Sequence, residues 1–130
     1  MIVLDTHVVI WLAEDPGKVS LPAKRAIEEL ETSGHKPIIS GQSLYEIAWG
    51  VVRGRILSSL PIEELLAEVE RRLIVRPLTS QIALAAAQLP APFPTDPFDR
   101  IIAATAIVER APLLTADQRV RRSRAVRTLW

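Results

Sequence analysis

The 130-residue chain has no cysteine and no asparagine, and it contains only five glycines. Without cysteine there is neither a disulfide nor a thiolate metal site, and both absences fit an intracellular protein. The glycines form neither GxGxxG nor GxxxxGK[ST], so the loops that bind nucleotide phosphates are absent. No apolar run approaches the roughly 18 residues of a membrane helix, and the first residues do not resemble a signal peptide. We therefore expect a cytoplasmic protein without a membrane segment.

What the chain does contain is a substantial apolar fraction, 48%, with 24% charged residues. No linker or low-complexity segment divides it, so residues 1–130 are expected to form a single domain. Strand-like and helix-like segments alternate, which predicts a three-layer α/β/α sandwich with a central parallel sheet. The strands are expected near residues 2–4, 37–40, 73–78, 113–115 and 125–129. The helices are expected near residues 6–13, 23–31, 43–52, 61–72, 82–89 and from 97 onward. The first of them is expected to be buried, because its apolar run is too continuous for an exposed helix.

Acidic residues follow the predicted strands. Four of the five aspartates, Asp5, Asp96, Asp99 and Asp117, stand where a strand gives way to a helix or at the start of a helix, and Glu46 comes shortly after the strand at 37–40. Parallel strands share one carboxyl edge, where α/β folds place their ligands, so these acids are expected to converge there. Like charges in one crevice repel, and protonation or a bound cation must relieve the repulsion. A divalent metal ion is the first interpretation.

Each acid also has a structural interpretation. Asp5, Asp96 and Asp117 are placed to cap helices, Asp99 to occupy the third helical position, and Glu46 to form a capping box with a serine three residues earlier. Ordinary caps are drawn from serine, threonine and asparagine as well, whereas this chain uses a carboxylate at every predicted edge position. Asp96 remains the best candidate for a cap alone.

Carboxylate oxygens favour Mg²⁺ or Mn²⁺, and the chemistry that fits such a site best is phosphodiester hydrolysis. The two histidines form no metal pair. His7 could touch a substrate or form a hydrogen bond at a helix start. Residues 110–130 hold six arginines and one acid, a formal +5 that leaves −4 for the rest of the chain. These arginines either hold a polyanion near the metal or form a solvated surface.

Four short motifs, in this order and at these separations, resemble those of the PIN-domain ribonucleases, and within them the VapC-type toxins of toxin–antitoxin pairs. The resemblance covers essentially the whole chain. The motifs are Leu4-Asp5-Thr6-His7, Ser43-Leu44-Tyr45-Glu46-Ile47, Asp96-Pro97-Phe98-Asp99-Arg100 with the alanine-rich helix after it, and Leu114-Thr115-Ala116-Asp117. The closing residues 126–130 are also similar to that subgroup.

The resemblance implies a metal-dependent endoribonuclease that uses Mg²⁺ or Mn²⁺, forms a homodimer and binds a cognate antitoxin that blocks its active site. It implies that the metal ligands are Asp5, Glu46, Asp99 and Asp117. It places Thr6, Asp96 and Thr115 beside the site, and we expect RNA contacts from Arg100, Arg119, Arg121, Arg122 and Arg124. The segment Pro92-Phe93-Pro94-Thr95 departs from relatives that carry basic or histidine residues there, which bears on substrate contacts.

Two other classes stay open. A phosphoacceptor receiver domain also gathers carboxylates around Mg²⁺, but it would carry a pair of acids after the first strand and a late lysine. Here Asp5 stands alone, and no lysine follows Lys36. A catalytically silent PIN-like interaction module would usually have lost one or more of the four acids, all of which are present.

Overall fold

A computed structural model describes all residues, 1–130. Five short strands form one sheet in the order β3-β2-β1-β4-β5, and every neighbouring pair is parallel. The strands are β1 (Val3–Leu4), β2 (Ile38–Ser40), β3 (Ile74–Arg76), β4 (Leu113–Leu114) and β5 (Thr128–Leu129). Because β1 is the central strand, the residue that follows it lies in the middle of the carboxyl edge of the sheet.

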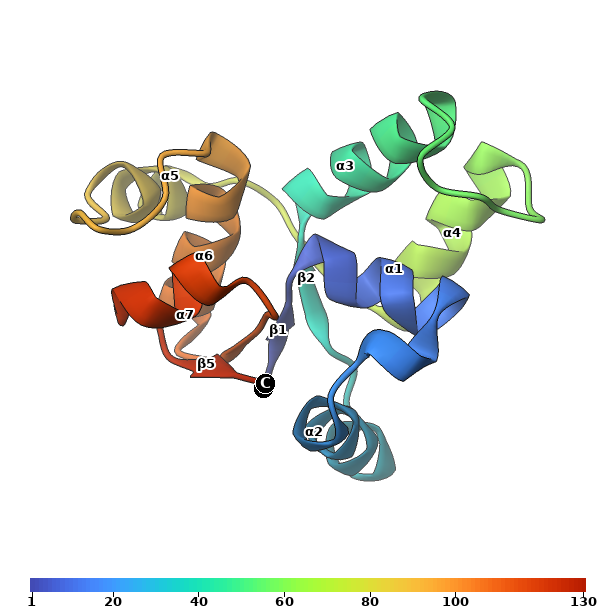
Figure 1. The fold of residues 1–130 in the computed structure, drawn as a ribbon, viewed down its shortest axis with the longest axis horizontal. Coiled ribbons are helices and arrows are strands. Elements are labelled where there is room, and N and C mark those ends of the chain that lie inside the picture. Colours follow the sequence, from blue (N-terminus) through green and yellow to red (C-terminus); the bar gives the residue numbers. More distant parts are fainter.

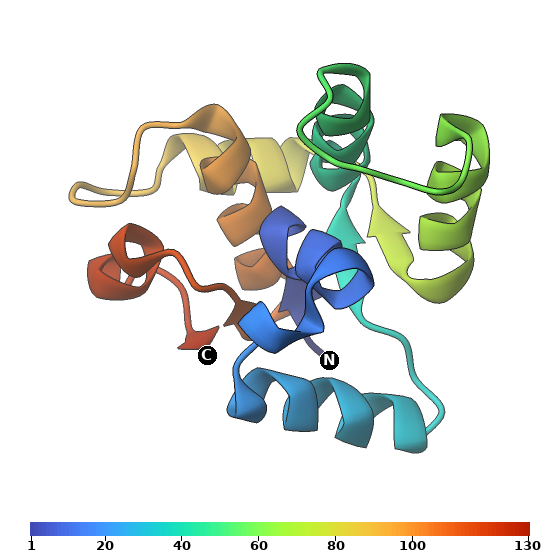
Figure 2. The same ribbon diagram turned by 45° about the vertical axis from the view of Figure 1, so that its right-hand side comes forward.

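The helices are α1 (Thr6–Glu14), α2 (Leu21–Thr32), α3 (Gly41–Val52), α4 (Ile62–Arg72), α5 (Ser80–Ala87), α6 (Pro97–Glu109) and α7 (Gln118–Ser123), with one 3₁₀ turn, η1 (Pro16–Lys18). In Figure 1 the helices α5, α6 and α7 lie on one side of β1 and β2, and α1 to α4 lie on the other. In the turned view α3 and α5 come close to each other at the top of the sheet, above β2 (Figure 2).

Consecutive strand residues point to opposite faces of a sheet, and this alternation builds two cores. Val3, Ile38 and Leu113 belong to a buried cluster with residues of α6 and α7. Leu4, Ile39 and Leu114 belong to a second cluster with residues of α1 to α4. Continuous apolar runs in the strands are therefore explained by burial on both faces, as in other parallel sheets covered by helices.

The expected three-layer α/β/α architecture with a parallel sheet is confirmed. Three local expectations need correction. The third helix begins at Gly41 with Ser40 as its cap, two residues earlier than predicted. The last strand covers only Thr128–Leu129 of the expected 125–129. In α1 only Thr6 and Val8 are buried, since the helix lies at the surface of the second core.

The half-buried residues of α1 line a cavity of about 700 Å³ between α1, α2, α4 and the loop that follows α3. None of the acids predicted for the metal site lines this cavity. No helix combines the length and the apolar character that crossing a membrane requires.

Candidate functional site

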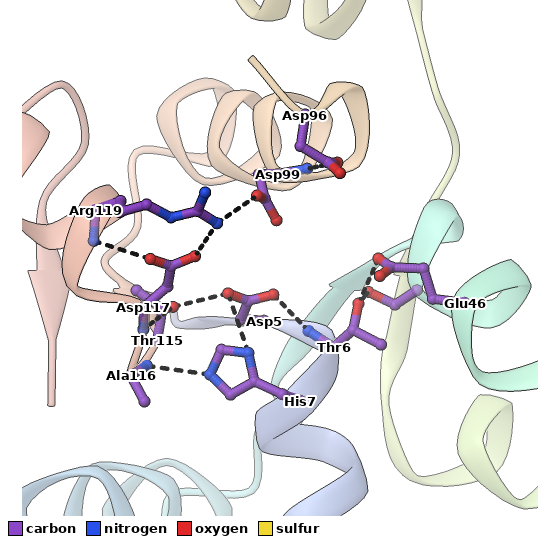
Figure 3. A network of polar contacts seen from close by, with 11 residues as sticks. Asp5, Thr6, His7, Glu46, Asp96, Asp99, Thr115, Ala116, Asp117 and Arg119 are labelled. Atoms are coloured by element: carbon purple, nitrogen blue, oxygen red, sulfur yellow. Dashed lines mark hydrogen bonds and ion pairs between the residues drawn. The ribbon is translucent and has the colours of Figure 1, made fainter. Parts of the chain in front are cut away.

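Asp5 occupies the centre of the carboxyl edge. It follows β1, and its backbone N–H donates to the carbonyl of Leu114 in β4 at 3.0 Å, which sets it beside the end of that strand. Its Oδ1 accepts from the backbone N–H of Thr6 at 2.8 Å, capping α1. Its Oδ2 accepts from the Thr115 hydroxyl at 2.7 Å (Figure 3). Asp5 is buried, with 7% exposure, so these bonds compensate for lost water.

Glu46 reaches the same edge from α3. The Thr6 hydroxyl donates to Glu46 Oε1 at 2.8 Å and also lies 2.9 Å from the Ser43 hydroxyl. A hydroxyl has one proton, so Ser43 is the donor in the contact with Thr6. Burial raises the pKa of Glu46 above its ordinary value; the Thr6 hydrogen bond lowers it, and the nearby charges of Asp5 and Asp96 raise it.

Asp96 and Asp99 lie at the start of α6. Asp96 Oδ1 accepts from the backbone N–H groups of Phe98 at 2.8 Å and Asp99 at 3.3 Å, which is an N-cap, and Pro97 occupies the first helical position. Asp99 is third in the helix, as expected. Burial raises the pKa of Asp99 to about 7, with further increases from the charges of Asp5, Asp96, Asp117 and Glu46. Four other carboxylates are therefore close enough to repel it.

Asp117 follows β4 and caps α7 by accepting from the backbone N–H of Arg119 at 2.9 Å. The Arg119 side chain turns back into the acids, with a guanidinium nitrogen 3.4 Å from Asp117 Oδ2 and 4.0 Å from Asp99 Oδ2 (Figure 3). Burial alone would raise the pKa of Asp117, but the hydrogen bonds and charge of Arg119 outweigh burial and lower it. Arg119 is thus the cation among these carboxylates.

His7 is part of the same network. Its Nε2 lies 3.1 Å from the backbone N–H of Ala116 and must accept, which places the proton of the neutral ring on Nδ1. Nδ1 lies 3.5 Å from Asp5 Oδ2 and points its proton toward that carboxylate (Figure 3). Trp11 and Trp130 flank the ring, with centroids 4.7 Å and 6.4 Å away. His7 therefore orients Asp5.

The structure brings together seven of the residues predicted for the site or beside it: Asp5, Thr6, Glu46, Asp96, Asp99, Thr115 and Asp117. Their carboxylates interact electrostatically, but no group of three or more His, Cys, Asp or Glu side chains is spaced closely enough to hold a metal ion. The oxygen-only donor set still fits a hard divalent cation, because burial and the charges of four neighbouring acids raise the pKa of Asp99, and a cation would offset both effects.

Apart from Arg119, the arginines predicted to bind RNA divide into two groups. Arg121, Arg122 and Arg124 are exposed on or just after α7. Arg100 differs from expectation, because its guanidinium donates to the carbonyls of four residues before α6: Ala86, Ala87, Leu89 and Pro94. These bonds occupy its donors and make it a clamp that holds α6 to the end of α5 and to the loop between them.

Sequence reasoning missed the role of Ser43. The proposed capping box of Ser43 and Glu46 is wrong because Ser40 caps α3, and Ser43 lies inside the helix, fully buried against Thr6. A serine and a glutamate three residues apart share one helix face, and that spacing was the available signal.

Comparison with known proteins agrees with this architecture. The family model described as PIN domain matches residues 2–125. The chain is 34% identical over 131 residues to Ribonuclease VapC22 of Mycobacterium tuberculosis (strain ATCC 25618 / H37Rv), covering 99% of this chain and 98% of that protein. Two similar solved structures are VapBC2 from Rickettsia felis bound to a promoter DNA fragment (TM-score 0.72, 20% identity, 99% of this chain and 98% of that chain) and DNA-bound VapBC from Salmonella typhimurium (TM-score 0.71, 26% identity, 98% and 96%). The VapC-type resemblance read from the motifs is confirmed, and the chain belongs to the PIN domain family.

Proposed function

We propose that the protein is a divalent-metal-dependent endoribonuclease in which a single domain hydrolyses RNA phosphodiester bonds. The observation that carries this proposal is the state of Asp99, whose pKa is raised to about 7 by burial and by four surrounding acids. An α/β protein that only needed helix caps would gain nothing from such repulsion. In a cation site the repulsion between carboxylates favours binding, because the ion relieves that repulsion when it binds.

Asp5, Glu46, Asp99 and Asp117 are the residues proposed to hold Mg²⁺ or Mn²⁺. A bound ion of this kind supplies positive charge to the phosphate and lowers the pKa of a water that attacks it. The carboxylates are not spaced for coordination as they stand. We infer that side chains move when an ion binds, and that the 70%-exposed Arg119 releases Asp99 and Asp117.

The residues around these ligands have definite tasks. Thr115 and the backbone of Thr6 hold one oxygen each of Asp5. The Thr6 hydroxyl fixes Glu46. His7 keeps a proton directed at Asp5, which orients the carboxylate. Together they position an acid-lined surface against which a phosphate can sit only when cations offset its charge.

Arginine supplies part of that positive charge. Arg119, once released from the acids, is within reach of a phosphate at the site, and its planar guanidinium suits bidentate contacts. Arg121, Arg122 and Arg124 extend the positive charge along α7 and are proposed to contact the RNA backbone without sequence preference.

We further propose that the protein is the toxin of a toxin–antitoxin pair, active in the cytoplasm as a homodimer and blocked by a cognate antitoxin. Similarity to Ribonuclease VapC22 over the whole chain supports the toxin assignment. The similarity to the two VapBC structures supports the antitoxin partner.

The test is cleavage of structured RNAs by purified protein with Mg²⁺, Mn²⁺ or EDTA, followed by mapping of the cut ends. Wild type is expected to cut only with metal, and Asp5→Asn is expected to lower the rate by orders of magnitude while remaining folded. Asp15→Asn is the matched control, because Asp15 is the one aspartate outside the site and makes only an exposed contact with Lys18 at 3.9 Å.

Expression in bacteria separates the biological alternatives. Wild type should arrest growth, Asp5→Asn should be harmless, and Asp15→Asn should behave as wild type does. Equal toxicity of wild type and Asp5→Asn would show that toxicity does not depend on nuclease action. A folded wild type that neither cuts RNA nor arrests growth would identify a silent interaction module instead.

A further inference from the structure

Three aromatic side chains form a row beside the acids, in which Tyr45 and Trp49 are exposed and Phe98 is half-buried. Tyr45 and Trp49 lie one turn apart on α3, with ring centroids 6.1 Å apart and planes inclined by 25°, so they are stacked. Phe98 of α6 contacts Tyr45 edge-on at 5.8 Å. Tyr45 is 50% and Trp49 is 43% exposed, which is high for rings of this size.

These rings are not part of the core. None of the three belongs to a hydrophobic cluster on either face of the sheet. The other two tryptophans differ from Trp49, because Trp11 and Trp130 pack against the core around α1. Exposed aromatic rings that gather outside the core, such as Tyr45 and Trp49, are typical of a surface that binds a partner.

The row begins at the acids. Tyr45 and Phe98 immediately precede Glu46 and Asp99, and their contact joins α3 to the start of α6. At the other end the Arg53 guanidinium lies 4.2 Å from the centroid of the Trp49 ring. Tyr45, Trp49 and Arg53 are spaced by four residues, so they follow one another along one side of the helix over about 12 Å.

We propose that Tyr45 and Trp49 form a platform on which unpaired bases of the RNA stack, next to the phosphate that is cut. This inference rests on the proposed function. Aromatic faces stack on any base, and an arginine beside them can pair with the backbone phosphate. Charge complementarity favours RNA over an apolar protein surface, because the Arg53 guanidinium lies directly on the exposed Trp49 ring. The platform requires bases that are free of a duplex, so cleavage is directed to single-stranded or looped sites.

Binding in EDTA tests the platform separately from cleavage. A fluorescein-labelled single-stranded RNA is titrated with wild type, Tyr45→Ala, Trp49→Ala, Trp49→Phe and the control Leu57→Ala, whose side chain is 81% exposed and lies in the loop after α3. Each alanine change in the platform should weaken binding about tenfold. Trp49→Phe should keep most of the affinity, and Leu57→Ala should keep all of it. Affinity for a duplex of the same sequence should be unaffected by every change.

Intrinsic fluorescence gives a second readout of stacking. Single-stranded RNA should quench the tryptophan emission of wild type, and Trp49→Phe should lose this quenching while still binding. Quenching that persists in Trp49→Phe would overturn the platform, because it would come from Trp11 or Trp130.

Two further measurements separate the remaining outcomes. If wild type cuts RNA with Mn²⁺ while Tyr45→Ala and Trp49→Ala bind and cut as wild type does, the nuclease stands and the platform is wrong. If the alanine variants lose RNA affinity only because they convert a dimer to a monomer in sedimentation, the row is an interface between two copies and the platform is again wrong. If wild type cuts no RNA, the proposed function fails independently of the binding result.

Discussion

Asp99→Asn is expected to stabilise the metal-free protein at high pH and leave it unchanged at low pH. Asparagine keeps the shape of a protonated aspartic acid but never ionises. In the native state the pKa of Asp99 is about 7, against 3.8 for an aspartate side chain free in water. The carboxyl therefore contributes its full share of stability below pH 4, and that share is lost as the pH rises to about 7.

The size of the effect follows from these two pKa values. A change from 3.8 to about 7 corresponds to about 4 kcal/mol of destabilisation once the carboxyl is fully ionised, at about 1.4 kcal/mol for each tenfold change in the ionisation constant. Two terms reduce the gain on substitution. The Asp99 side chain is 24% exposed, which screens the repulsion, and a charge in the first turn of α6 stabilises the helix by about 0.3–1 kcal/mol. We expect a net stabilisation of about 2 kcal/mol at pH 8.

Melting curves in EDTA at pH 3.5 and pH 8 measure the difference, which should be close to zero at the lower pH and about 8 °C at the higher. Saturating Mn²⁺ should then stabilise wild type by RT ln(1 + [L]/Kd), about 2.7 kcal/mol at one hundred times Kd, and Asp99→Asn should lose most of this gain. If Asp99→Asn melts below wild type in EDTA at pH 8 and keeps the full metal-induced shift, Asp99 only supports the helix and the electrostatic argument is wrong.

Three further predictions use other parts of the site. Asp96→Ala should cost about 1 kcal/mol of stability with or without metal, because it removes an N-cap; a cost that appears only with Mn²⁺ would make Asp96 a ligand. His7→Ala should lower kcat more than it raises KM, since His7 orients Asp5 and holds no substrate; a change in KM alone, measured by steady-state cleavage, would contradict this. Changing Arg121, Arg122 and Arg124 together to glutamine should reduce the slope of log affinity against log salt for single-stranded RNA by about 2, and an unchanged slope would show that these arginines are only solvated.

The fold was predictable because the parallel sheet is buried on both faces. Such strands read as short continuous apolar runs, and Ile38–Ser40 and Leu113–Leu114 were located from this signal within one or two residues. The final strand was overextended, because Ala125 and Val126 are apolar for another reason. Val126 is buried in the core under α6, and Ala125 packs against it, before the chain pairs with β4.

The orientation of side chains at the site could not be predicted from spacing. Nothing in the sequence showed that Arg119 would fold back onto Asp99, that Arg100 would be occupied by backbone carbonyls, or that the His7 ring would face Asp5. Each of these depends on the path of a loop or on a rotamer, which pattern arguments do not reach. Arg100 and Arg119 carry the same charge, so the sequence predicts RNA contacts from both. Only the backbone carbonyls around Arg100 show that its donors are already occupied.

In the sequence, capping a helix and binding a metal ion are alternative roles for each acid. In the structure one aspartate can have both roles. Asp5 caps α1 through Oδ1 and turns Oδ2 toward Thr115 and His7. Asp117 caps α7 through Oδ1 and turns Oδ2 toward Arg119. A carboxylate has two oxygens, so one can satisfy a helix terminus while the other serves the site. Capping then orients the carboxylate, and the cap explains why aspartate, with its short side chain, stands at the ends of β1 and β4.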